Sequence, residues 1–492
     1  MKVRSFLKYK YLFIRSFLKT TLFRYLVAGT SASLLDILIF NSLIYLSGTY
    51  YILAAVISNT LSFFVRFFLQ KHYAFKSHEK KGIQREFFAY TLLFVAGIIF
   101  TSLLMYAFVD KLYINESLAQ IFSIIIIAGI SFFVYRFIVF PNKERKEIKR
   151  ILIFTQKVDR NDTVLGFFHS WIIEFSKVFD KVRVVCLEKG EYDLPDNVSV
   201  FSLGKEERQS RLQYLIHFYW YVLYERNNYD AVFVHMNKEY VILGGVIWKL
   251  MNKKIFFWRN HKVGNFITDI SVFLSNKVFC TSASSYTAKF KKTTIMPVGI
   301  NTDLFVRKVE IVKKPRSILS IGRIAPVKKI EILIEALSEI KKKGVKFETS
   351  IYGDPLEKDI GYFESLKNKV IEYKLGDTVF FYPGVSNEET VHIYNSHETF
   401  VNLSLSGAYD KTIFEAMACE SLICASSLDL KNIIDKNFIF EENNHMDLAN
   451  RLEYILNLDQ TTKENMGKNL RNTVIESHSL KKLVEKIKFY FE

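Results

Sequence analysis

The feature that most constrains this chain is a set of four long apolar stretches within its first 140 residues. They span approximately residues 22–46, 51–70, 87–109 and 117–140, and short polar connections separate them. A helix needs about 20 mostly apolar residues to cross the hydrocarbon core of a bilayer. Four such runs in succession predict four transmembrane helices. The alternative, four buried core helices of a large soluble protein, does not explain the short connections and their segregated charge.

The net charge of the chain follows the same division. The 492 residues include 67 Lys and Arg and 50 Asp and Glu, a net charge of +17. Residues 1–150 contribute +13 of this charge, with 20 basic and 7 acidic residues, while residues 151–492 contribute only +4. An excess that lies in the most apolar third of the chain indicates a membrane rather than a nucleic-acid partner. We therefore exclude a nucleic-acid-binding function.

The positions of the basic residues also predict an orientation. They cluster before the first apolar stretch, around the second connection (residues 72–85) and after the fourth stretch, and the third connection (residues 110–116) has only Lys111. Loops on the cytoplasmic side are the ones enriched in Lys and Arg. We expect a multi-pass protein of the inner (cytoplasmic) membrane, with both ends of this region and the rest of the chain in the cytoplasm. The first stretch is too long for a cleaved signal peptide.

A few polar groups lie within these stretches, and the candidates for a function are Asp36, Asn59, Arg66 and Arg136. Polar groups are costly in hydrocarbon and therefore often mark a function. The two arginines lie near cytoplasmic ends, so reaching out to the lipid headgroups is an alternative for them. Asp36 lies mid-span, and we expect it to face the bundle and find a partner. A role of this set in a transport pathway or in binding a lipid phosphate is a hypothesis.

The first 140 residues resemble the GtrA-like family of four-span membrane proteins. The resemblance rests on residues 23–29 (Phe-Arg-Tyr-Leu-Val-Ala-Gly), on Asp36 twelve residues after Arg24, and on two related segments that end the even-numbered spans. These segments are residues 62–67 with 73–75 and residues 131–137 with 139–140, and they indicate an internal two-span repeat. The resemblance implies a unit that moves polyprenyl-phosphate-linked sugars or assists the enzymes that make them. The family usually has Asn before the Arg of each segment, whereas Val65 and Tyr135 stand here, which weakens the implication of transport.

From about residue 150 the pattern changes to short β-rich runs that alternate with helical periods. This alternation predicts parallel sheets covered by helices on both faces. About 340 residues exceed one such sheet, so we expect two doubly wound α/β domains and a division into residues 1–145, 146–300 and 301–492. The predicted strands are residues 151–154, 182–187, 198–203, 231–235, 254–258 and 277–280, and then 317–321, 347–352, 378–381, 400–403 and 422–425.

The cysteines and histidines point to no metal centre. Cys186, Cys280, Cys419 and Cys424 form no C-x-x-C pair, and each lies in or beside an apolar run, as buried reduced thiols do. His392 and His397 are far from other candidate ligands. We expect neither a metal nor a cofactor.

Three segments carry candidate ligand chemistry. In residues 320–329, Gly322 permits a tight turn after a strand, and Arg323 and Lys328 lie at the carboxyl edge of the sheet, where a guanidinium and an ammonium suit a diphosphate. In residues 407–418, a loop leads into a helix whose Glu415 can accept from two ribose hydroxyls. Spacing alone leaves a solvated basic loop and an exposed helical glutamate as alternatives. Residues 297–305 form a compact turn between the domains, or a plain linker.

These segments, in this order, resemble glycosyltransferase family 4. The resemblance covers about residues 150–492 and is strongest over 297–425. It implies two facing Rossmann-like domains (the GT-B fold) and a nucleotide-diphosphate-sugar donor. It implies that Arg323 and Lys328 bind the donor diphosphate and that Glu415 binds the ribose. The other implied contacts to the base or ribose are Gly353, Asp354, Gly384 and Val385, the last two through backbone atoms.

One departure from the family concerns the loop before Glu415. The family commonly has two glutamates eight residues apart, and Gly407 occupies the first position. The local text, Ser-Gly-Ala-Tyr-Asp-Lys, is similar to a subgroup with an Asp-Lys pair in this loop. We therefore expect contacts to the sugar from Asp410, Lys411 and the loop backbone. An inactive domain is the alternative, against which stand Arg323, Lys328 and Glu415.

The acceptor side is less distinctive. Asn161, Asp162 and Gly166 follow the first predicted strand, where acceptor or phosphate contacts across a cleft belong. His261, after the strand at residues 254–258, resembles the cleft histidine of the family and is a candidate for contact with the transferred sugar. His235 is a second candidate of lower rank. A histidine at a strand end is often structural, and that alternative stays open for both.

The sequence therefore predicts a membrane-anchored, retaining glycosyltransferase that acts on a lipid-linked or cell-surface glycan acceptor. Polyprenyl phosphate is one candidate for the lipid of that acceptor. Fixed cations at Arg323 and Lys328 stabilise a departing diphosphate, so we expect a metal-independent, front-face reaction. A translocase of lipid-linked sugars whose soluble part supplies cargo is one alternative, and a binding protein with an inactive domain is another. The expected partners are a nucleotide sugar, the acceptor and membrane lipids; no oligomeric state is predicted.

Overall fold

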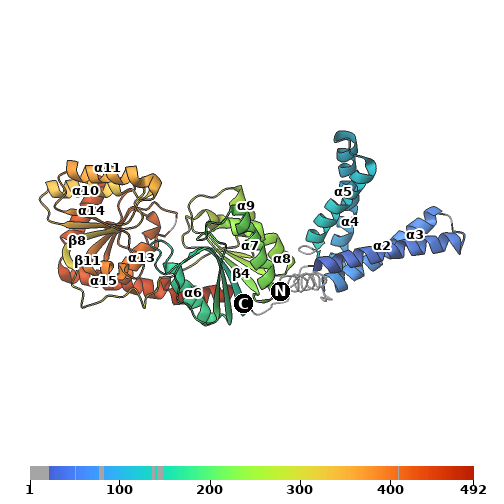
Figure 1. The fold of residues 1–492 in the computed structure, drawn as a ribbon, viewed down its shortest axis with the longest axis horizontal. Helices are drawn as coiled ribbons and strands as arrows, with labels where there is room; N and C mark the ends of the chain where they lie inside the picture. Colours follow the sequence, from blue (N-terminus) through green and yellow to red (C-terminus); the bar gives the residue numbers. More distant parts are fainter. Residues whose placement is uncertain are drawn as a thin grey trace. The chain divides into compact units, whose positions relative to one another are not determined.

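The computed structural model describes residues 21–49, 51–76, 83–135, 139–140, 148–407 and 409–491. The chain divides into two compact units, Met1–Lys146 and Glu147–Glu492 (Figure 1). Each unit is described by itself below.

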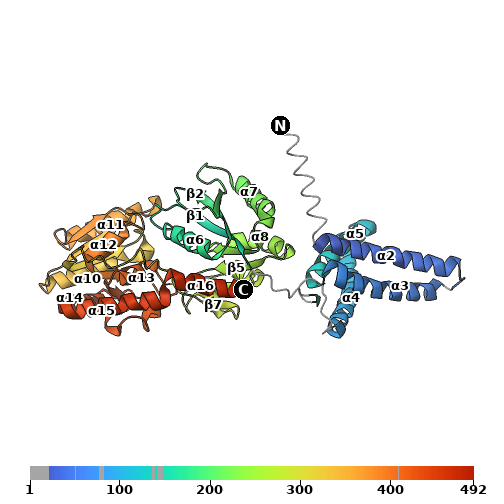
Figure 2. The same ribbon diagram turned by 90° about the horizontal axis from the view of Figure 1, so that it is seen from below.

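The first unit consists of two helical hairpins. Helices α2 (Thr21–Tyr45) and α3 (Tyr51–Phe68) form one, and α4 (Ile83–Tyr106) and α5 (Glu116–Val134) form the other. The two hairpins diverge from a common base (Figures 1 and 2), so the expected four-helix bundle is not confirmed. Among the described residues, one segment, Thr21–Leu43, is long and apolar enough to cross a membrane, and Glu86–Gly97 and Ile125–Val134 are shorter apolar helices.

An aromatic cluster joins the bases of the two hairpins, and it displays the repeat in the sequence. After the π-helical turn η1 (Leu69–Ala74), the amide of Phe75 donates to the carbonyl of Gln70 at 2.9 Å. The amide of Phe140 donates to the carbonyl of Tyr135 at 2.8 Å, so both repeats end in the same five-residue closure. The rings of Phe75 and Phe140 stack with their centroids 5.4 Å apart. The internal repeat thus has a structural counterpart.

The polar side chains of the first unit connect its helices. Asp36 on α2, which we expected to find a partner, accepts a hydrogen bond from Ser62 of α3 at 3.0 Å. Arg66 on α3 donates to the Ser33 hydroxyl of α2 at 3.3 Å. Buried Lys71 pairs with Glu86 at the start of α4. Arg136 and the side chain of Asn59 lie outside what the structure describes.

The first lobe of the second unit is a parallel sheet of seven strands in the order β3-β2-β1-β4-β5-β6-β7. Residues 151–154 alternate between its two faces, because Ile151 and Ile153 belong to one core and Leu152 and Phe154 to the other. Helix α6 (Phe167–Val178) covers one face, and α7 (Arg211–Tyr224), α8 (Lys238–Leu250) and α9 (Phe266–Leu274) cover the other. The strands are β1 (Arg150–Val158), β2 (Lys181–Lys189), β3 (Val198–Ser202), β4 (Ala231–His235), β5 (Lys254–Trp258), β6 (Lys277–Cys280) and β7 (Thr293–Ile295).

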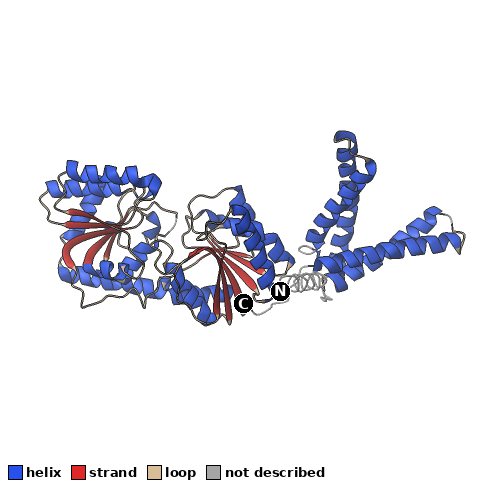
Figure 3. Ribbon diagram, viewed as in Figure 1, coloured by secondary structure: helices blue, strands red, loops and turns tan. Residues whose placement is uncertain are grey.

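The second lobe is a parallel sheet of five strands in the order β10-β9-β8-β11-β12, again between helices (Figure 3). Two parallel sheets wrapped by helices confirm the predicted α/β class for this part of the chain. All four cysteines are free and buried, as expected. The strands are β8 (Lys314–Ile321), β9 (Glu348–Tyr352), β10 (Val379–Tyr382), β11 (His397–Asn402) and β12 (Leu422–Ala425). The helices are α10 (Ile330–Lys342), α11 (Ile360–Glu372), α12 (Thr390–Ser396), α13 (Lys411–Ala418), α14 (His445–Leu456) and α15 (Gln460–Thr473).

The last helix, α16 (Leu480–Phe491), returns to the first lobe. The chain crosses between the lobes twice, and the two crossings bond to each other, because the amides of Gly299 and Ile300 both donate to the carbonyl of His478 at 2.9 Å. Leu483 and Ile487 then pack beside α6 in the core of the first sheet, and the ring of Phe491 lies 3.7 Å from that of Phe256. The predicted boundary at residue 300 assigns α16 to the second lobe, whereas α16 packs in the core of the first lobe.

Candidate active site

A cleft of about 520 Å³ opens between the two sheets of the second unit. Its walls are loops that follow the carboxyl ends of strands in both lobes, the usual place for ligands of doubly wound α/β domains. Its volume lies within the range typical of small-molecule sites. The second lobe contributes Arg323, Lys328, Asp354, Asp410, Lys411 and Glu415 among others, and the first lobe contributes Thr163, Val164, Phe167, Met236 and Asn260.

Two glycines shape the floor of the cleft. Gly322 ends β8 with a φ of +150°, and Gly353 ends β9 with a φ of +153°. A Cβ atom at residue 353 would lie 2.0 Å from the carbonyl oxygen of Gly322, and this distance is too short for any residue with a side chain. The close approach lets the amide of Gly322 donate to the Tyr352 carbonyl at 3.0 Å. The turn that follows directs the chain through Arg323 into the short helix η6 (Pro326–Lys328).

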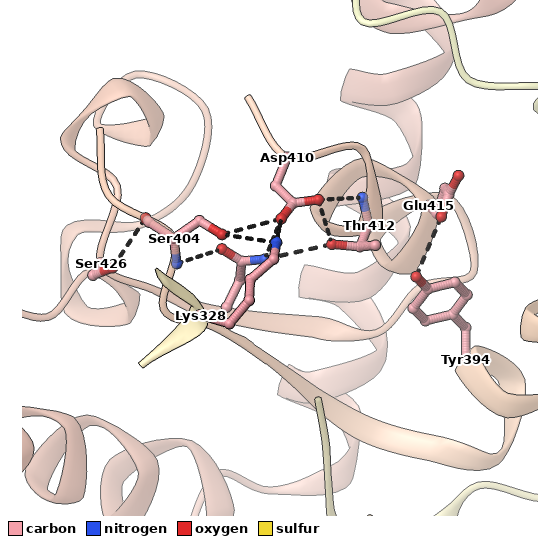
Figure 4. Close-up of polar contacts among 8 residues, drawn as sticks. Lys328, Tyr394, Ser404, Asp410, Thr412, Glu415 and Ser426 are labelled. Carbon is pink, nitrogen blue, oxygen red and sulfur yellow. Dashed lines mark hydrogen bonds and ion pairs between the residues drawn. The ribbon is translucent and has the colours of Figure 1, made fainter. Parts of the chain in front are cut away.

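Lys328 has a carboxylate partner in this structure (Figure 4). Its ammonium lies 2.6 Å from Oδ2 of Asp410 and 3.3 Å from the hydroxyl of Ser404. The neighbouring Arg323 is exposed at the rim of the cleft, and no hydrogen bond or ion pair is found for it within the part of the chain that the structure describes. Two cations thus lie at one end of the cleft, one neutralised and one open to a ligand.

Hydrogen bonds from several neighbouring residues fix the carboxylate of Asp410. Its Oδ1 accepts from the amide of Thr412 at 3.3 Å and from the Thr412 hydroxyl at 2.8 Å, which makes it the N-cap of α13. Its Oδ2 accepts from Asn402 at 3.2 Å and Ser404 at 3.0 Å in addition to Lys328. Burial opposes ionisation of this carboxyl group, but the charge and hydrogen bonds of Lys328 prevail and lower its pKa well below the ordinary value.

Glu415 lies deeper, on the second turn of α13. Only 4% of its surface is exposed, and it accepts from Asn387 at 3.2 Å. It also accepts from the Tyr394 hydroxyl at 3.3 Å (Figure 4). Burial raises its pKa, an effect that the nearby ammonium of Lys411 partly offsets. The buried carboxylate still borders the cleft, so a ligand with two hydroxyl donors would complete its hydrogen bonding.

Lys411 connects the two lobes. It starts α13 in the second lobe, yet its ammonium donates to the Gly299 carbonyl at 2.9 Å and lies 4.3 Å from the ring centroid of Phe167 in the first lobe. The ring of Trp171 is on the same side, at 4.9 Å. Burial lowers the pKa of Lys411 to about 8, while the charge of Glu415 acts in the opposite direction. Lys411 therefore lies between the cleft and Gly299, where the chain crosses from one lobe to the other.

Gly407 packs against the first lobe. Its φ is +121°, and a Cβ atom there would lie 2.5 Å from Cβ of Lys262. Its carbonyl accepts from the Ser285 hydroxyl at 3.0 Å, and its amide donates to Asp429 at 2.8 Å. Ser284 donates to the other oxygen of Asp429 at 2.6 Å. The position at which the family commonly has its first glutamate is thus a point of contact between the lobes here, with no room for a side chain.

Comparison with known families assigns these regions. Residues 301–473, which contain the second-lobe part of the cleft, match the glycosyl transferases group 1 family, and residues 24–140 match the GtrA/DPMS transmembrane domain. The chain joins a GtrA-like region to a glycosyl transferase group 1 region. The resemblance of the first region is thereby confirmed, and that of the second region is confirmed at the level of the group 1 glycosyl transferases.

Individual proteins are also similar to this chain. Over 192 residues, 36% of this chain, it is 27% identical to the alpha-monoglucosyldiacylglycerol synthase of Streptococcus pneumoniae, and the match spans 42% of the length of that relative. The structure of Anabaena HepE in complex with UDP and glucose superimposes with a TM-score of 0.57 at 16% identity, over 70% of this chain and 99% of HepE. Sucrose-phosphate synthase from Thermosynechococcus elongatus also gives 0.57 at 16% identity, over 70% and 98%. At such identities the likeness shows the fold, which is GT-B-like.

The cleft between the two lobes brings together most of the residues predicted for the donor side. Gly322, Gly353, Asp354, Gly384 and Val385 line it together with the cations and with Asp410, Lys411 and Glu415. Asp354 also has a structural partner, because its Oδ2 accepts from the amide of Gly384 at 3.0 Å.

Other predicted residues lie outside the lining of the cleft. The ring of His261 is exposed and bonds at 2.9 Å to the backbone of Val263. His235 is buried and stacks on Phe168, with ring centroids 4.2 Å apart. Asp162 accepts from the amides of Val164 and Leu165, and Asn161 donates to Glu191 at 2.9 Å. A Cβ on Gly166 would lie 2.6 Å from the Asp162 carbonyl, so this glycine serves the same turn.

Several lining residues were not predicted. They are Thr163, Val164, Phe167, Met236 and Asn260 from the first lobe and Ile321, Tyr352, Pro355, Leu356, Asn387, Thr390, Tyr394, Tyr409 and Thr412 from the second. Thr163 and Val164 follow Asp162 directly and Phe167 begins α6, so a search of the whole segment after β1 would have found these three. Tyr394 and Asn387 carry no such signal, because only the fold brings them to Glu415. Within the described residues, no group of three or more His, Cys, Asp and Glu is arranged to hold a metal ion.

Proposed function

We propose that this protein is a membrane-anchored glycosyltransferase that transfers a sugar from a nucleotide diphosphate donor to a lipid-linked or cell-surface glycan acceptor at the cytoplasmic face of the membrane. The observation that carries the proposal is the convergence of Arg323, Lys328 and Glu415, from two distant segments, on one cleft between two α/β lobes. The match of residues 301–473 to the group 1 glycosyl transferases supports it.

The proposed donor site follows from the charges in the cleft. Arg323 and Lys328 hold the diphosphate, and the buried carboxylate of Glu415 accepts from the ribose hydroxyls. Asp410 occupies Lys328 in the structure, so the arriving diphosphate competes with this carboxylate for the ammonium. HepE of Anabaena was solved with UDP and glucose, and we infer that a UDP-sugar is the first donor to test.

The proposed chemistry needs stabilisation of negative charge on the leaving diphosphate. Fixed cations lower this barrier because they need no reorganisation as the bond breaks. We propose that Arg323 and Lys328 supply this stabilisation without a metal ion. The reaction retains the anomeric configuration, with the acceptor attacking from the donor's own face and a phosphate oxygen taking its proton. Closure of the two lobes, which Lys411 and Gly407 connect, excludes water.

A second candidate is translocation of a lipid-linked sugar by the first unit. It rests on the polar contacts between Asp36 and Ser62 and between Arg66 and Ser33, which lie within an apolar hairpin of the region that matches the GtrA/DPMS transmembrane domain. In that case the group 1 region supplies cargo, and synthesis does not depend on its cleft.

One experiment distinguishes the two. The full chain is reconstituted in lipid vesicles, supplied with UDP-sugars and extracted lipid acceptors, and assayed for released UDP. We expect Arg323→Ala to lower kcat/KM by about 100-fold or more, the usual effect of losing one group that stabilises developing charge. We expect Glu415→Gln to raise KM for the donor, because it removes the charge that accepts from the ribose hydroxyls. Lys367→Ala and Glu372→Gln, on α11 and outside the cleft lining, are the matched controls and should leave turnover unchanged. Unchanged UDP release by the Arg323→Ala/Glu415→Gln double variant would exclude this cleft as the site of sugar transfer, and a lack of UDP release by the unaltered chain would favour translocation.

A further inference from the structure

The ammonium group of Lys411 lies where two general effects oppose a positive charge. Lys411 is the first residue of α13, and the N-terminus of a helix is the positive end of its dipole. The group is also enclosed between the lobes, and burial lowers its pKa to about 8. The charge therefore depends on groups that compensate for both effects, and the origin of these groups indicates what Lys411 does.

Most of the compensating groups lie outside α13. The rings of Phe167 and Trp171, both on α6 of the first lobe, have their centroids 4.3 and 4.9 Å from the ammonium, within the range of a cation–π contact. The carbonyls of Val298 and Gly299 accept hydrogen bonds from it at 3.3 and 2.9 Å. Both carbonyls belong to the crossing that leads from β7 to β8. We name these two rings and two carbonyls the Lys411 socket.

Gly299 connects the socket to the rest of the lobe boundary. Its carbonyl also accepts from the indole nitrogen of Trp171 at 3.0 Å, and its amide donates to the carbonyl of His478, in the second crossing, at 2.9 Å. Its φ is +79°, and a Cβ atom there would collide with Leu483 of α16. Both crossings and α6 thus fix the socket, and the side chain that enters it comes from the second lobe.

Within α13, the charge of Glu415 supports the ammonium. Residues four positions apart lie on the same side of a helix, and Lys411 and Glu415 border one small pocket together with Phe167, Trp171 and Gly299. The charge of Glu415 raises the pKa of Lys411 and so acts against burial. Because Glu415 also lines the cleft, Lys411 connects the orientation of the lobes to a residue of the donor side.

We infer that Lys411 is a positioning residue that holds the two lobes in one orientation, because the rings of α6 stabilise its charge only while the lobes stay in that orientation. The sequence predicts a contact between Lys411 and the transferred sugar, whereas the contacts of its ammonium favour a role between the lobes. This role does not depend on the chemistry of the cleft. A chain without transferase activity would contradict the proposed function and leave the inference standing.

Distances between spin labels test the inference in the full chain, without a nucleotide. The four native cysteines are buried, so the labels attach to introduced cysteines at Leu212→Cys on α7 and Lys468→Cys on α15, both exposed positions. We expect a narrow distribution of distances when Lys411 is present. Lys411→Met removes the charge and should raise the ratio of open to closed conformations by about tenfold. Lys411→Arg keeps a charge and should retain the narrow distribution.

Lys367→Met is the matched control. The ammonium of Lys367 also lies over a ring, that of Phe363 at 4.2 Å, but both residues belong to α11, so their contact does not join the lobes. The control should leave the distribution of distances unchanged. Thermal unfolding verifies that each labelled variant is folded.

A pH titration tests the same charge without a substitution in the socket. We expect open conformations to increase as the pH rises through about 8, because the ammonium then loses its proton and its attraction to the rings. Helix α6 and the crossing face Lys411 with rings and carbonyls, and the titratable groups around it are His235 of β4, Asp410, Glu415 and Tyr394 of α12. The pKa of His235 is lowered to about 3, that of Asp410 lies well below its ordinary value, and that of Tyr394 is raised well above 10. These three groups therefore keep their charge in this window.

Glu415→Gln assigns the transition to its group. It removes the charge that raises the pKa of Lys411, so the midpoint should move to lower pH. The inference is overturned if Lys411→Met has the same distribution as the unsubstituted chain, or if Lys411→Arg is as open as Lys411→Met. It is also overturned if the distribution does not change between about pH 7 and 9, or if Glu415→Gln abolishes the transition, which would then belong to Glu415.

Discussion

At the residue scale, the cleft depends on positions where a single added atom would collide with a neighbouring residue. Gly353 approaches the Gly322 carbonyl so closely that the two strand ends touch, and Gly407 approaches Lys262 of the other lobe in the same way. Both have φ values in the region that favours glycine. These contacts set the separation between the loops that present Arg323, Lys328 and Glu415.

Gly353→Ala tests this constraint. We expect it to lower the free energy of unfolding by about 1–3 kcal/mol, because the new methyl group must displace the Gly322 carbonyl and adopt a strained φ. Thermal unfolding of the full chain, with hydrogen exchange of the β8 and β9 peptides, measures the effect. Gly361→Ala on α11 is the control, since a Cβ there meets nothing within 4 Å. It should be neutral or slightly stabilising. Equal stabilities of the two variants would contradict the steric argument.

His235 illustrates a residue whose candidate role changes once its surroundings are known. It lies in the core of the first lobe on Phe168, with Thr155 as a partner at 3.3 Å. Burial, and secondarily the charge of Lys411, lowers its pKa from 6.5 to about 3. Below pH 6.5 the unfolded chain takes up a proton here that the folded chain refuses. Folded stability must therefore fall as the pH falls through the window from 6.5 to 3.

This pH dependence is measurable, because all four tryptophans lie in the second unit and report its unfolding. We expect His235 to contribute up to about 1.4 kcal/mol of lost stability per pH unit below pH 6.5. His235→Asn should flatten the slope of unfolding free energy between pH 6.5 and 5, whatever its effect on stability at pH 7. His392→Asn, which changes an exposed histidine, should leave the slope as it was. An unaltered slope in His235→Asn would show that His235 takes up its proton in the folded state as well.

At the element scale, helices and strands form where their periodicities predict, but their partners depend on the rest of the chain. The apolar residues Leu480, Leu483, Val484 and Ile487 of α16 follow a helical period. That period is the same whether the helix covers the second sheet, next in sequence, or the first. The bonds of Gly299 and Ile300 to His478 direct the chain back across the hinge and place α16 beside α6.

Substitutions on α16 test its place in the first lobe. Leu483→Ala removes a fully buried side chain and should cost about 2–5 kcal/mol, the usual range for such cavities in a core. Phe489→Ala, on the same helix but 69% exposed, should change stability by less than about 0.5 kcal/mol. Tryptophan fluorescence during urea unfolding measures both, because all four tryptophans belong to the first lobe. A greater loss of stability for Phe489→Ala than for Leu483→Ala would show that the side of α16 with Phe489 faces the core.

At the scale of the whole molecule, the distribution of charge connects the regions of the chain. Most of the excess of +17 lies in residues 1–150, and the second unit concentrates +8 over residues 203–292. In both places the basic residues accompany apolar ones. In residues 1–150 this pattern is the one that predicts a membrane orientation for the first region.

The sequence by itself determined the class of each region and much of the donor side of the cleft. Hydrophobic periodicity is local, so it separates apolar helices from alternating strands and helices. Residues 322–328 follow β8, and the loop that leads to Glu415 follows β11, so the two segments must meet at one sheet edge. Asn161, Asp162 and His261 also follow strands, yet their side chains serve their own loops. Spacing identifies the loop but not the direction of a side chain.

Only the tertiary structure decided which residues meet across long distances in the chain. The bonds of Tyr394 and Asn387 to Glu415, the approach of Lys411 to Phe167, and the return of α16 all join segments that no local pattern relates. The arrangement of the first unit as two diverging hairpins, in place of the expected bundle, also could not be read from a local pattern. In each case the partner is chosen by packing and by satisfied buried polar groups, and these depend on the whole chain at once.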